Sequence, residues 1–252
     1  MSIKKILVSQ PRPESEKSPY FDIAQKHGVE IVFRPFIKVE GLSSREFRQQ
    51  KINIADFTAV IFTAKIAVDS FFRLCEEMRI TIPITMKYFC TSETIANYLQ
   101  KYIVYRKRKI FASNTGRLSD LVPYLAKHKT EKFLWAVSDV NNGSESSLLE
   151  SAKINFTRAA LYRTVSNDFA PDEAFDYDML VFFSPQGIDS LLKNFPDFKQ
   201  DKIAIAALGP STAKSVTDAG LRLDIQAPAP EAPSMPAAID RWLTTEKDKT
   251  SA

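Results

Sequence analysis

The chain has 252 residues, 44% hydrophobic and 25% charged, a composition typical of a soluble globular protein with one large domain or two smaller ones. Its net charge of +4 is compatible with an anionic ligand but is weak evidence for nucleic acid binding. No apolar run approaches the ~20 residues of a membrane span, and the N-terminus does not resemble a signal peptide. Cys75 and Cys90 have no CxxC spacing, and His27 and His128 lack the spacing of a metal site, so we expect a reduced, cytoplasmic protein without metal or cofactor.

Short apolar runs alternate with segments of helical periodicity along nearly the whole chain. The predicted strands are 4–9, 29–33, 56–62, 88–90, 110–111, 132–138, 158–165, 176–183, 203–208 and 223–227. The predicted helices are 19–27, 47–53, 66–78, 95–99, 118–128, 144–152, 188–194, 213–219 and 235–243. Segment 34–39 contains Pro35, which suits a connector better than a central strand. The alternation predicts an α/β fold with parallel sheets covered by helices.

The most informative stretch runs from Lys202 to Gly220. It predicts a strand, a tight turn at Gly209, and a helix start that carries the hydroxyls of Ser211 and Thr212. Ligands of open α/β sheets bind at the carboxyl ends of the strands, and free N–H groups at helix starts suit anions. The alternative is that Gly209 only makes the turn and a hydroxyl only caps the helix.

The sequence also contains an internal repeat. Segment 56–62 aligns with 176–182, and the register continues through 68–70 against 188–190. Segment 92–96 then aligns with 209–213, so each copy is a strand, a hydroxyl-bearing turn and a helix, followed by the same again. The alternative is that any two βαβα segments look alike, but the shared order and spacing favour duplication into two similar domains.

Four consecutive cations, 106–109, precede the predicted strand at 110–111. Such a run is usually a solvated face. Its other use would be to attract a polyanion, which keeps nucleic acid binding as a weaker hypothesis.

Several segments together resemble the uroporphyrinogen-III synthase family. They are ILVSQPRP, DFTAVIFTAKIAV, ALYRTV, FFSPQGI and IAALGPSTAKSVTDAGL, followed by DIQAPAPEAPSM, and they spread over roughly residues 3 to 243. The resemblance implies two Rossmann-like or flavodoxin-like parallel-sheet domains joined by a two-stranded connector. The first would comprise residues 1–37 with 166–246, the second 40–162, and 247–252 would be a frayed tail.

The resemblance implies an enzyme of tetrapyrrole and haem biosynthesis that needs no cofactor. Such enzymes cyclise hydroxymethylbilane with inversion of ring D and loss of water, giving uroporphyrinogen III. Tyr162 matches the family tyrosine proposed as general acid, although it could simply pack on the connector. The substrate-binding positions implied by motif are Arg12, Thr63, Lys65, Ser92, Thr94, Ser184, Gln186, Gly209, Ser211 and Thr212. We expect a monomer that does not bind nucleic acid or membranes and contacts hydroxymethylbilane synthase transiently.

The chain departs from the family pattern in its middle part. Ala64 stands where a serine is usual, and Ser92 and Ile95 replace residues of a usual Gly-x-x-Thr-Ala turn. Glu93 adds an anion where substrate carboxylates should bind. These departures keep open a second hypothesis, a non-catalytic relative that binds or senses a tetrapyrrole.

Overall fold

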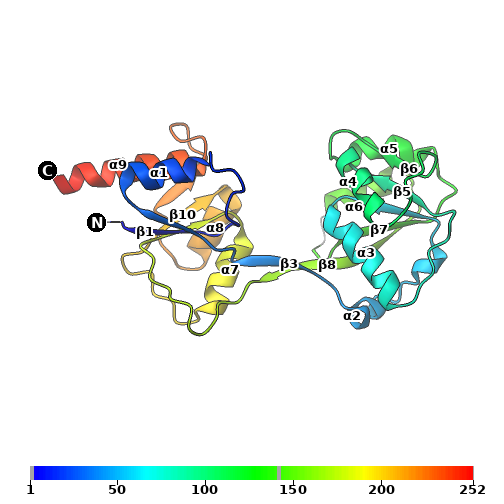
Figure 1. The fold of residues 1–252 in the computed structure, drawn as a ribbon, viewed down its shortest axis with the longest axis horizontal. Coiled ribbons are helices and arrows are strands. Elements are labelled where there is room, and N and C mark those ends of the chain that lie inside the picture. Colours follow the sequence, from blue (N-terminus) through cyan, green and yellow to red (C-terminus); the bar gives the residue numbers. More distant parts are fainter. Residues whose placement is uncertain (1–2, 141–142, 252) are drawn as a thin grey trace. The chain divides into compact units, whose positions relative to one another are not determined.

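The computed structural model describes residues 3–140 and 143–251, and the chain divides into two units. Unit 1 comprises residues 1–38 and 165–252, and unit 2 comprises residues 39–164. Each unit has its own sheet and its own core on both faces of that sheet (Figure 1). Among the described residues, no helix is long and apolar enough to cross a membrane.

Unit 1 is a five-stranded sheet in which every pair of neighbours is parallel. Its order is β11 (Ile225–Ala227), β10 (Ala204–Leu208), β9 (Met179–Phe182), β1 (Lys5–Val8) and β2 (Glu30–Phe33). Helices α1 (Pro19–His27) and α9 (Met235–Ser251) cover one face, and α7 (Pro185–Asn194) and α8 (Pro210–Asp218) cover the other. Both faces are covered, so the central strands β9 and β10 are apolar throughout rather than alternating.

Unit 2 is a six-stranded sheet with a parallel centre. Its order is β3 (Ile37–Gly41), β8 (Phe156–Ser166), β7 (Phe133–Ser138), β4 (Ala59–Phe62), β5 (Lys87–Cys90) and β6 (Ile110–Ala112). One face packs under α2 (Ser44–Gln49), α3 (Lys65–Glu77) and α4 (Glu93–Tyr98), which a short 3-10 turn, η2 (Leu99–Lys101), extends. The other packs under α5 (Leu118–Ala126) and α6 (Gly143–Ser151), and another 3-10 turn, η1 (Ile54–Asp56), precedes β4.

The two sheets have the same strand order once the chain is read cyclically. Strands β9, β10, β11, β1 and β2 of unit 1 take the places of β4, β5, β6, β7 and β8 of unit 2. The predicted repeat lies on equivalent elements, because β4 and α3 begin 120 residues before β9 and α7. The α/β fold prediction, with two largely parallel sheets, is therefore confirmed, and unit 1 is a circular permutation of the unit 2 order.

The predicted strands and helices all occur, but several helices begin earlier than expected or run longer. The turns predicted at Pro185 and Pro210 are the first helical residues of α7 and α8. Proline suits this position because its missing N–H would have no intrahelical partner there. The expected 47–53 helix is α2 at 44–49, which begins at a capping box formed by Ser43 and Glu46. Helix α9 was expected to end at 243 with a frayed tail at 247–252, but it continues to Ser251.

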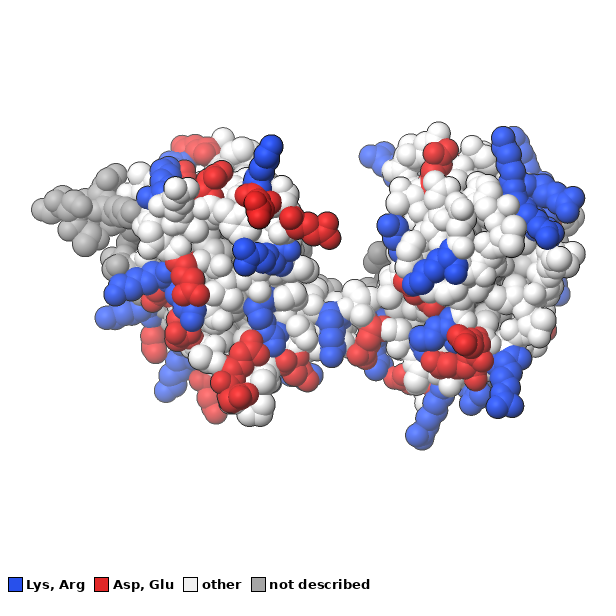
Figure 2. Space-filling view, viewed as in Figure 1, with Lys and Arg blue, Asp and Glu red and all other residues white. Residues whose placement is uncertain are grey.

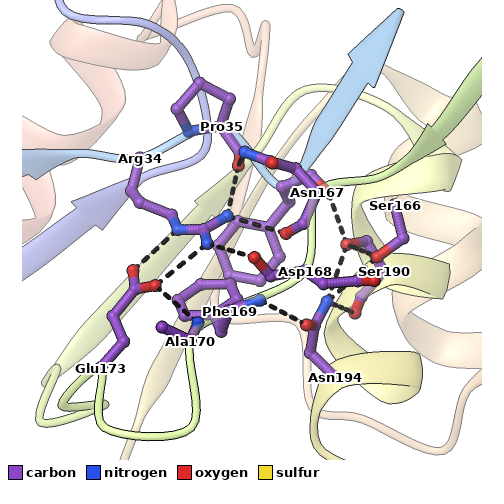
Figure 3. A network of polar contacts seen from close by, with 11 residues as sticks. Arg34, Pro35, Ser166, Asn167, Asp168, Phe169, Ala170, Glu173, Ser190 and Asn194 are labelled. Atoms are coloured by element: carbon purple, nitrogen blue, oxygen red, sulfur yellow. Dashed lines mark hydrogen bonds and ion pairs between the residues drawn. The ribbon is translucent and has the colours of Figure 1, made fainter. Parts of the chain in front are cut away.

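Strands β3 and β8 form the predicted connector. The Leu42 N–H donates to the Leu161 carbonyl and the Asn167 N–H donates to the Phe36 carbonyl, so the two strands run antiparallel. In unit 1 the Arg34 guanidinium holds the ends of both connector segments (Figure 3). It forms two bonds to the Glu173 carboxylate and donates to the carbonyls of Pro35, Asn167 and Asp168.

Candidate functional site

The carboxyl ends of the unit 2 strands place Tyr162 in line with the predicted turns. Ser138, at the end of β7, pairs with Tyr162 across a bulge. Continuing the registers of β7, β4 and β5 by two residues brings Ser138, Ala64 and Ser92 to the same level. Adjacent strands lie about 4.8 Å apart, so this row extends roughly 14 Å from Tyr162 to Ser92. The sheet therefore brings the predicted general acid and the predicted turn residues to one edge.

Tyr162 is a half-buried phenol at this edge. Its ring packs against the apolar core under α3 and α4. Burial raises the pKa of Tyr162 above its ordinary value of 10.0, and the Glu145 carboxylate on α6 raises it further, while Arg158 opposes the rise. The hydroxyl is therefore protonated at neutral pH. A phenol that keeps its proton can donate it to a leaving hydroxyl group.

The turns of unit 2 differ in how their polar groups are used. Ala64 is the N-cap of α3 and supplies no capping side chain, whereas the Ser92 hydroxyl caps α4 by accepting from the Ile95 N–H. Thr63 is half-buried at the end of β4, and Thr94 is exposed on α4. The first turn of α3 therefore keeps its N–H groups free of a side-chain cap, as an anion site requires.

Lys65 belongs to a polar cluster that sequence reasoning missed. Its ammonium lies 5.4 Å from the centre of the Tyr98 ring. The Asp69 carboxylate, one turn along α3, accepts from the hydroxyls of Tyr98 and Tyr102 and from Lys101. Burial pushes the pKa of Asp69 up, but these bonds outweigh it and the pKa is lowered. The cluster borders a hollow of about 590 Å³ along α3. Its only signal in the sequence was the i, i+3 and i+4 spacing of Tyr98, Lys101 and Tyr102.

Unit 1 presents a second set of predicted residues after β9 and β10. Ser184 is the N-cap of α7, but its hydroxyl makes no capping bond, and Gln186 is exposed in the first turn. Gly209 is the N-cap of α8 with φ +82° and ψ 157°, a conformation that only glycine adopts easily. Ser211 is exposed, whereas Thr212 is 1% exposed and packs inside. The sheet thus brings Ser184, Gln186, Gly209 and Ser211 to one edge.

Arg12 follows β1 at the same edge of unit 1. Its guanidinium lies 5.3 Å from the centre of the Phe21 ring on α1. The side chain is exposed, and stacking on the ring leaves its N–H groups able to meet an anion. Arg12 therefore adds a cation beside the turns, on the side of the sheet that α1 covers.

The two cysteines and His27 lie in the interior of the protein. Cys75 and Cys90 are free and buried, and burial raises the pKa of each thiol to about 12. His27 is also buried, and its Nε2 lies 2.6 Å from the Asp240 carboxylate. Within residues 3–140 and 143–251, no group of three or more His, Cys, Asp or Glu is placed to hold a metal ion.

Comparison with solved structures finds a similar fold in one of the two structures described below. The uroporphyrinogen-III synthetase from Helicobacter pylori has a TM-score of 0.57 and 17% sequence identity, with 96% of this chain and 100% of that chain covered. A variant uroporphyrinogen III synthase from the extremely thermophilic bacterium Thermus thermophilus has a TM-score of 0.48 and 13% identity, with 97% and 99% covered. No curated protein sequence matches this chain.

The family comparison covers most of the sequence. The family model described as uroporphyrinogen-III synthase HemD matches residues 19–237, which include the Tyr162 strand and the turns of both units. A match of this length shows that the chain belongs to the uroporphyrinogen-III synthase family, whose members are enzymes of haem biosynthesis.

Proposed function

We propose that this chain cyclises hydroxymethylbilane to uroporphyrinogen III with inversion of ring D and loss of water. The observation that carries the proposal is the position of Tyr162, a protonated phenol at the strand edge where the turns of unit 2 end. The family match supports the reaction, and the edge residues support an anionic substrate.

In this proposal Tyr162 starts the reaction. Its hydroxyl donates a proton to the terminal hydroxyl of the substrate, and the C–O bond breaks to release water. The lone pair of the pyrrole nitrogen stabilises the carbon that has lost the hydroxyl group. The product of this step is an azafulvene cation. Ring closure through a spiro intermediate then inverts ring D, and the proton lost from the product can return to the phenolate. The enzyme must hold the chain so that this route is faster than closure without inversion.

The carboxylates of the substrate would be held by the edge residues of each unit. In unit 2 we assign Thr63, Lys65, Ser92 and Thr94, with Lys65 supplying the cation. In unit 1 we assign Arg12, Ser184, Gln186, Gly209 and Ser211. Thr212 would support the start of α8 from inside rather than touch the substrate, because it is buried. These contacts are mostly hydroxyls and backbone N–H groups. Such neutral groups donate hydrogen bonds to carboxylates without requiring a fixed positive charge opposite each one.

The experiment is an isomer assay. The protein is mixed with freshly generated hydroxymethylbilane, the product is oxidised, and type I and type III porphyrins are separated. We expect an excess of type III that EDTA does not reduce, and a fall in kcat of about 10²–10⁴ for Tyr162→Phe, the usual contribution of a general acid. Type I alone from folded protein would reject the catalytic proposal. An unchanged kcat in Tyr162→Phe would reject the role of the phenol.

One observation favours a second candidate, a relative that binds a tetrapyrrole without turnover. In unit 2, Ala64 offers no hydroxyl at the helix start where Ser184 of unit 1 has one. Glu93 is exposed on the first turn of α4 and would repel a carboxylate. This candidate predicts that uroporphyrinogen or hydroxymethylbilane raises the melting temperature while the type III isomer does not form.

We further propose a cytoplasmic monomer that contacts hydroxymethylbilane synthase transiently and binds neither nucleic acid nor membranes. Membership of a haem-biosynthesis family supports a contact with the enzyme that supplies the substrate. Light scattering of the purified protein tests the monomer. Co-sedimentation with hydroxymethylbilane synthase tests the contact, and the isomer assay remains independent of both.

A further inference from the structure

One surface of unit 2 has no part in the proposed reaction. It lies before β5 and β6, at the amino ends of these strands, whereas the predicted turns of unit 2 follow the carboxyl ends of β4 and β5. Two aliphatic side chains stand out from it, Ile84 at 72% exposure and Val104 at 79%. Large aliphatic side chains that are exposed beside each other mark an interaction site more often than a single exposed side chain does.

Beneath these side chains is an apolar hollow of about 240 Å³. Buried Met86, Tyr88 and Ile110 are among its lining residues. Ile84 and Val104 line it as well, with Arg106 and Lys109 from the basic run. The hollow can therefore accept an apolar side chain while cations stand at its border.

A second hollow, of about 640 Å³, shares Ile84, Arg106 and Lys109 with the first and adds Arg108. Its lining also contains Lys87, whose charge is partnered by Glu131 at 2.5 Å. The pKa of Lys109 is lowered, first by burial and then by repulsion from Arg106 and Arg108. An incoming carboxylate would relieve that repulsion. Figure 2 shows Lys and Arg side chains together at the upper right of this unit, next to uncharged surface, and others spread over the rest of its visible face.

We propose that this apolar and basic surface docks an acidic segment of a partner protein, with one or two apolar side chains between Asp or Glu residues. The apolar hollow takes the anchor, and Arg106, Arg108 and Lys109 face the carboxylates. Nucleic acid would need exposed aromatic side chains for base stacking beside the cations. The exposed apolar residues that line the hollow, Ile84 and Val104, are aliphatic, and its aromatic residue Tyr88 is buried. Because the surface lies at the opposite end of β5 and β6 from the turns, a docked partner leaves the turns of unit 2 uncovered.

The test uses the full chain and short fluorescein-labelled peptides in an anisotropy titration. The first peptide has two leucines flanked by glutamates, the second replaces the leucines by serine, and the third replaces the glutamates by glutamine. We expect the first peptide to bind at least about tenfold tighter than either control, the effect of one well-placed anchor or charge cluster. Its binding should weaken as salt is added.

Exposed substitutions then locate the site without disturbing the core. Ile84→Ser and Arg108→Ser should each weaken the first peptide by about tenfold. Val140→Ser, also an exposed aliphatic at 54%, and Lys107→Ser, which is in the basic run but outside the lining of both hollows, should not. Three results would overturn the proposal: no binding of the first peptide, equal binding of the serine control, or tighter binding of oligo-dT that depends on Arg108.

Discussion

Replacing Arg34 by methionine should destabilise unit 1 because the arginine is largely buried and fully bonded. Its side chain is 17% exposed, and its guanidinium forms two bonds to Glu173 as well as three to backbone carbonyls (Figure 3). It also stacks 3.6 Å from the centre of the Phe169 ring. Methionine keeps the apolar stem and a contact with that ring, so the substitution removes mainly the charge and the donors.

The magnitude follows from what the substitution leaves behind. Removing one partner of a buried ion pair costs about 3–5 kcal/mol because the other charge stays desolvated. The Glu173 side chain is 30% exposed and still accepts from the Ala170 N–H, so water and that bond recover part of the loss. We therefore expect a loss of about 2–3 kcal/mol in the free energy of unfolding of unit 1.

Arg222 provides a matched control in the same unit. It too bonds to a carboxylate, Asp224, and to two carbonyls, but its side chain is 53% exposed. Arg222→Met should cost less than about 1 kcal/mol, as is usual for exposed ion pairs. If the two variants lose equal stability, the argument from burial is wrong.

The assay must separate the two units. The chain contains two tryptophans, Trp135 in unit 2 and Trp242 in unit 1. Labelling with 5-fluorotryptophan gives one fluorine resonance for each, which Trp242→Phe assigns. Urea titration of Arg34→Met should then lower the midpoint reported by Trp242 and leave that of Trp135 in place. If the urea midpoints reported by Trp242 and Trp135 fall by the same amount, the two units unfold together.

Three further predictions concern single groups. Because the pKa of Tyr162 is raised, Tyr162→Phe should lower kcat without changing the pH dependence below about pH 10, and a lost alkaline limb below that pH would contradict this. Gly209→Ala places no atom within 4 Å of its new Cβ but strains φ +82°, so urea unfolding should show a loss of about 1–3 kcal/mol, and an unchanged midpoint would remove the argument from strain. Hydrogen bonds from the Ser43 hydroxyl and N–H lower the pKa of Glu46 from 4.5 to about 2, so its stabilising effect is present above pH 4.5 and is lost as the pH falls from 4.5 towards 2. Glu46→Gln should therefore be less stable than the unmodified chain at neutral pH but nearly equal to it near pH 2, and a constant difference in urea midpoint would contradict the lowered pKa.

Periodicity and turn residues predicted the strands and helices because these depend on neighbours in sequence. The neighbours of each strand in space depend on packing instead. Strand β1 lies between β2 and β9, and nothing in the apolar run of 5–8 indicates a partner more than 170 residues away. That placement was expected only because of the family resemblance. The starts of α7 and α8, by contrast, had a local signal in Pro185 and Pro210 that a stricter use of proline preference would have found.

The candidate site shows the same division. Turn residues such as Ser184 and Gly209 could be predicted because a strand followed by a helix start is visible in the sequence. The hydrogen bonds to Asp69 could not be predicted from the sequence. Helix α3 carries the carboxylate, whereas the segment from α4 onward carries the donors Tyr98, Lys101 and Tyr102. Only the packing of these helices brings donors and acceptor together. For the same reason Thr212 was predicted on the surface, although its side chain turns inward.

The internal repeat explains which parts of the two units correspond and which do not. Ser70 and Ser190 occupy equivalent helix positions and are both buried against the connector strand β3. The Ser190 hydroxyl donates to the Phe36 carbonyl before β3, and the Ser70 hydroxyl lies 3.2 Å from where a Cβ on Gly41 would be, at the end of β3. Each unit therefore places a buried serine from the same helix position next to its own end of the connector.

The turns of the repeat correspond less well than these anchors. Unit 1 has the hydroxyl of Ser184 at a helix start where unit 2 has the methyl group of Ala64, although the two residues have nearly the same backbone angles. The backbone geometry is therefore kept while the side chain that could meet a ligand differs. Each unit has a cation beside its turns, Arg12 in unit 1 and Lys65 in unit 2, but only unit 2 adds the phenol of Tyr162, whereas unit 1 adds hydroxyls and backbone N–H groups. This difference assigns the proposed proton transfer to unit 2, and it leaves unit 1 mainly the binding of carboxylates.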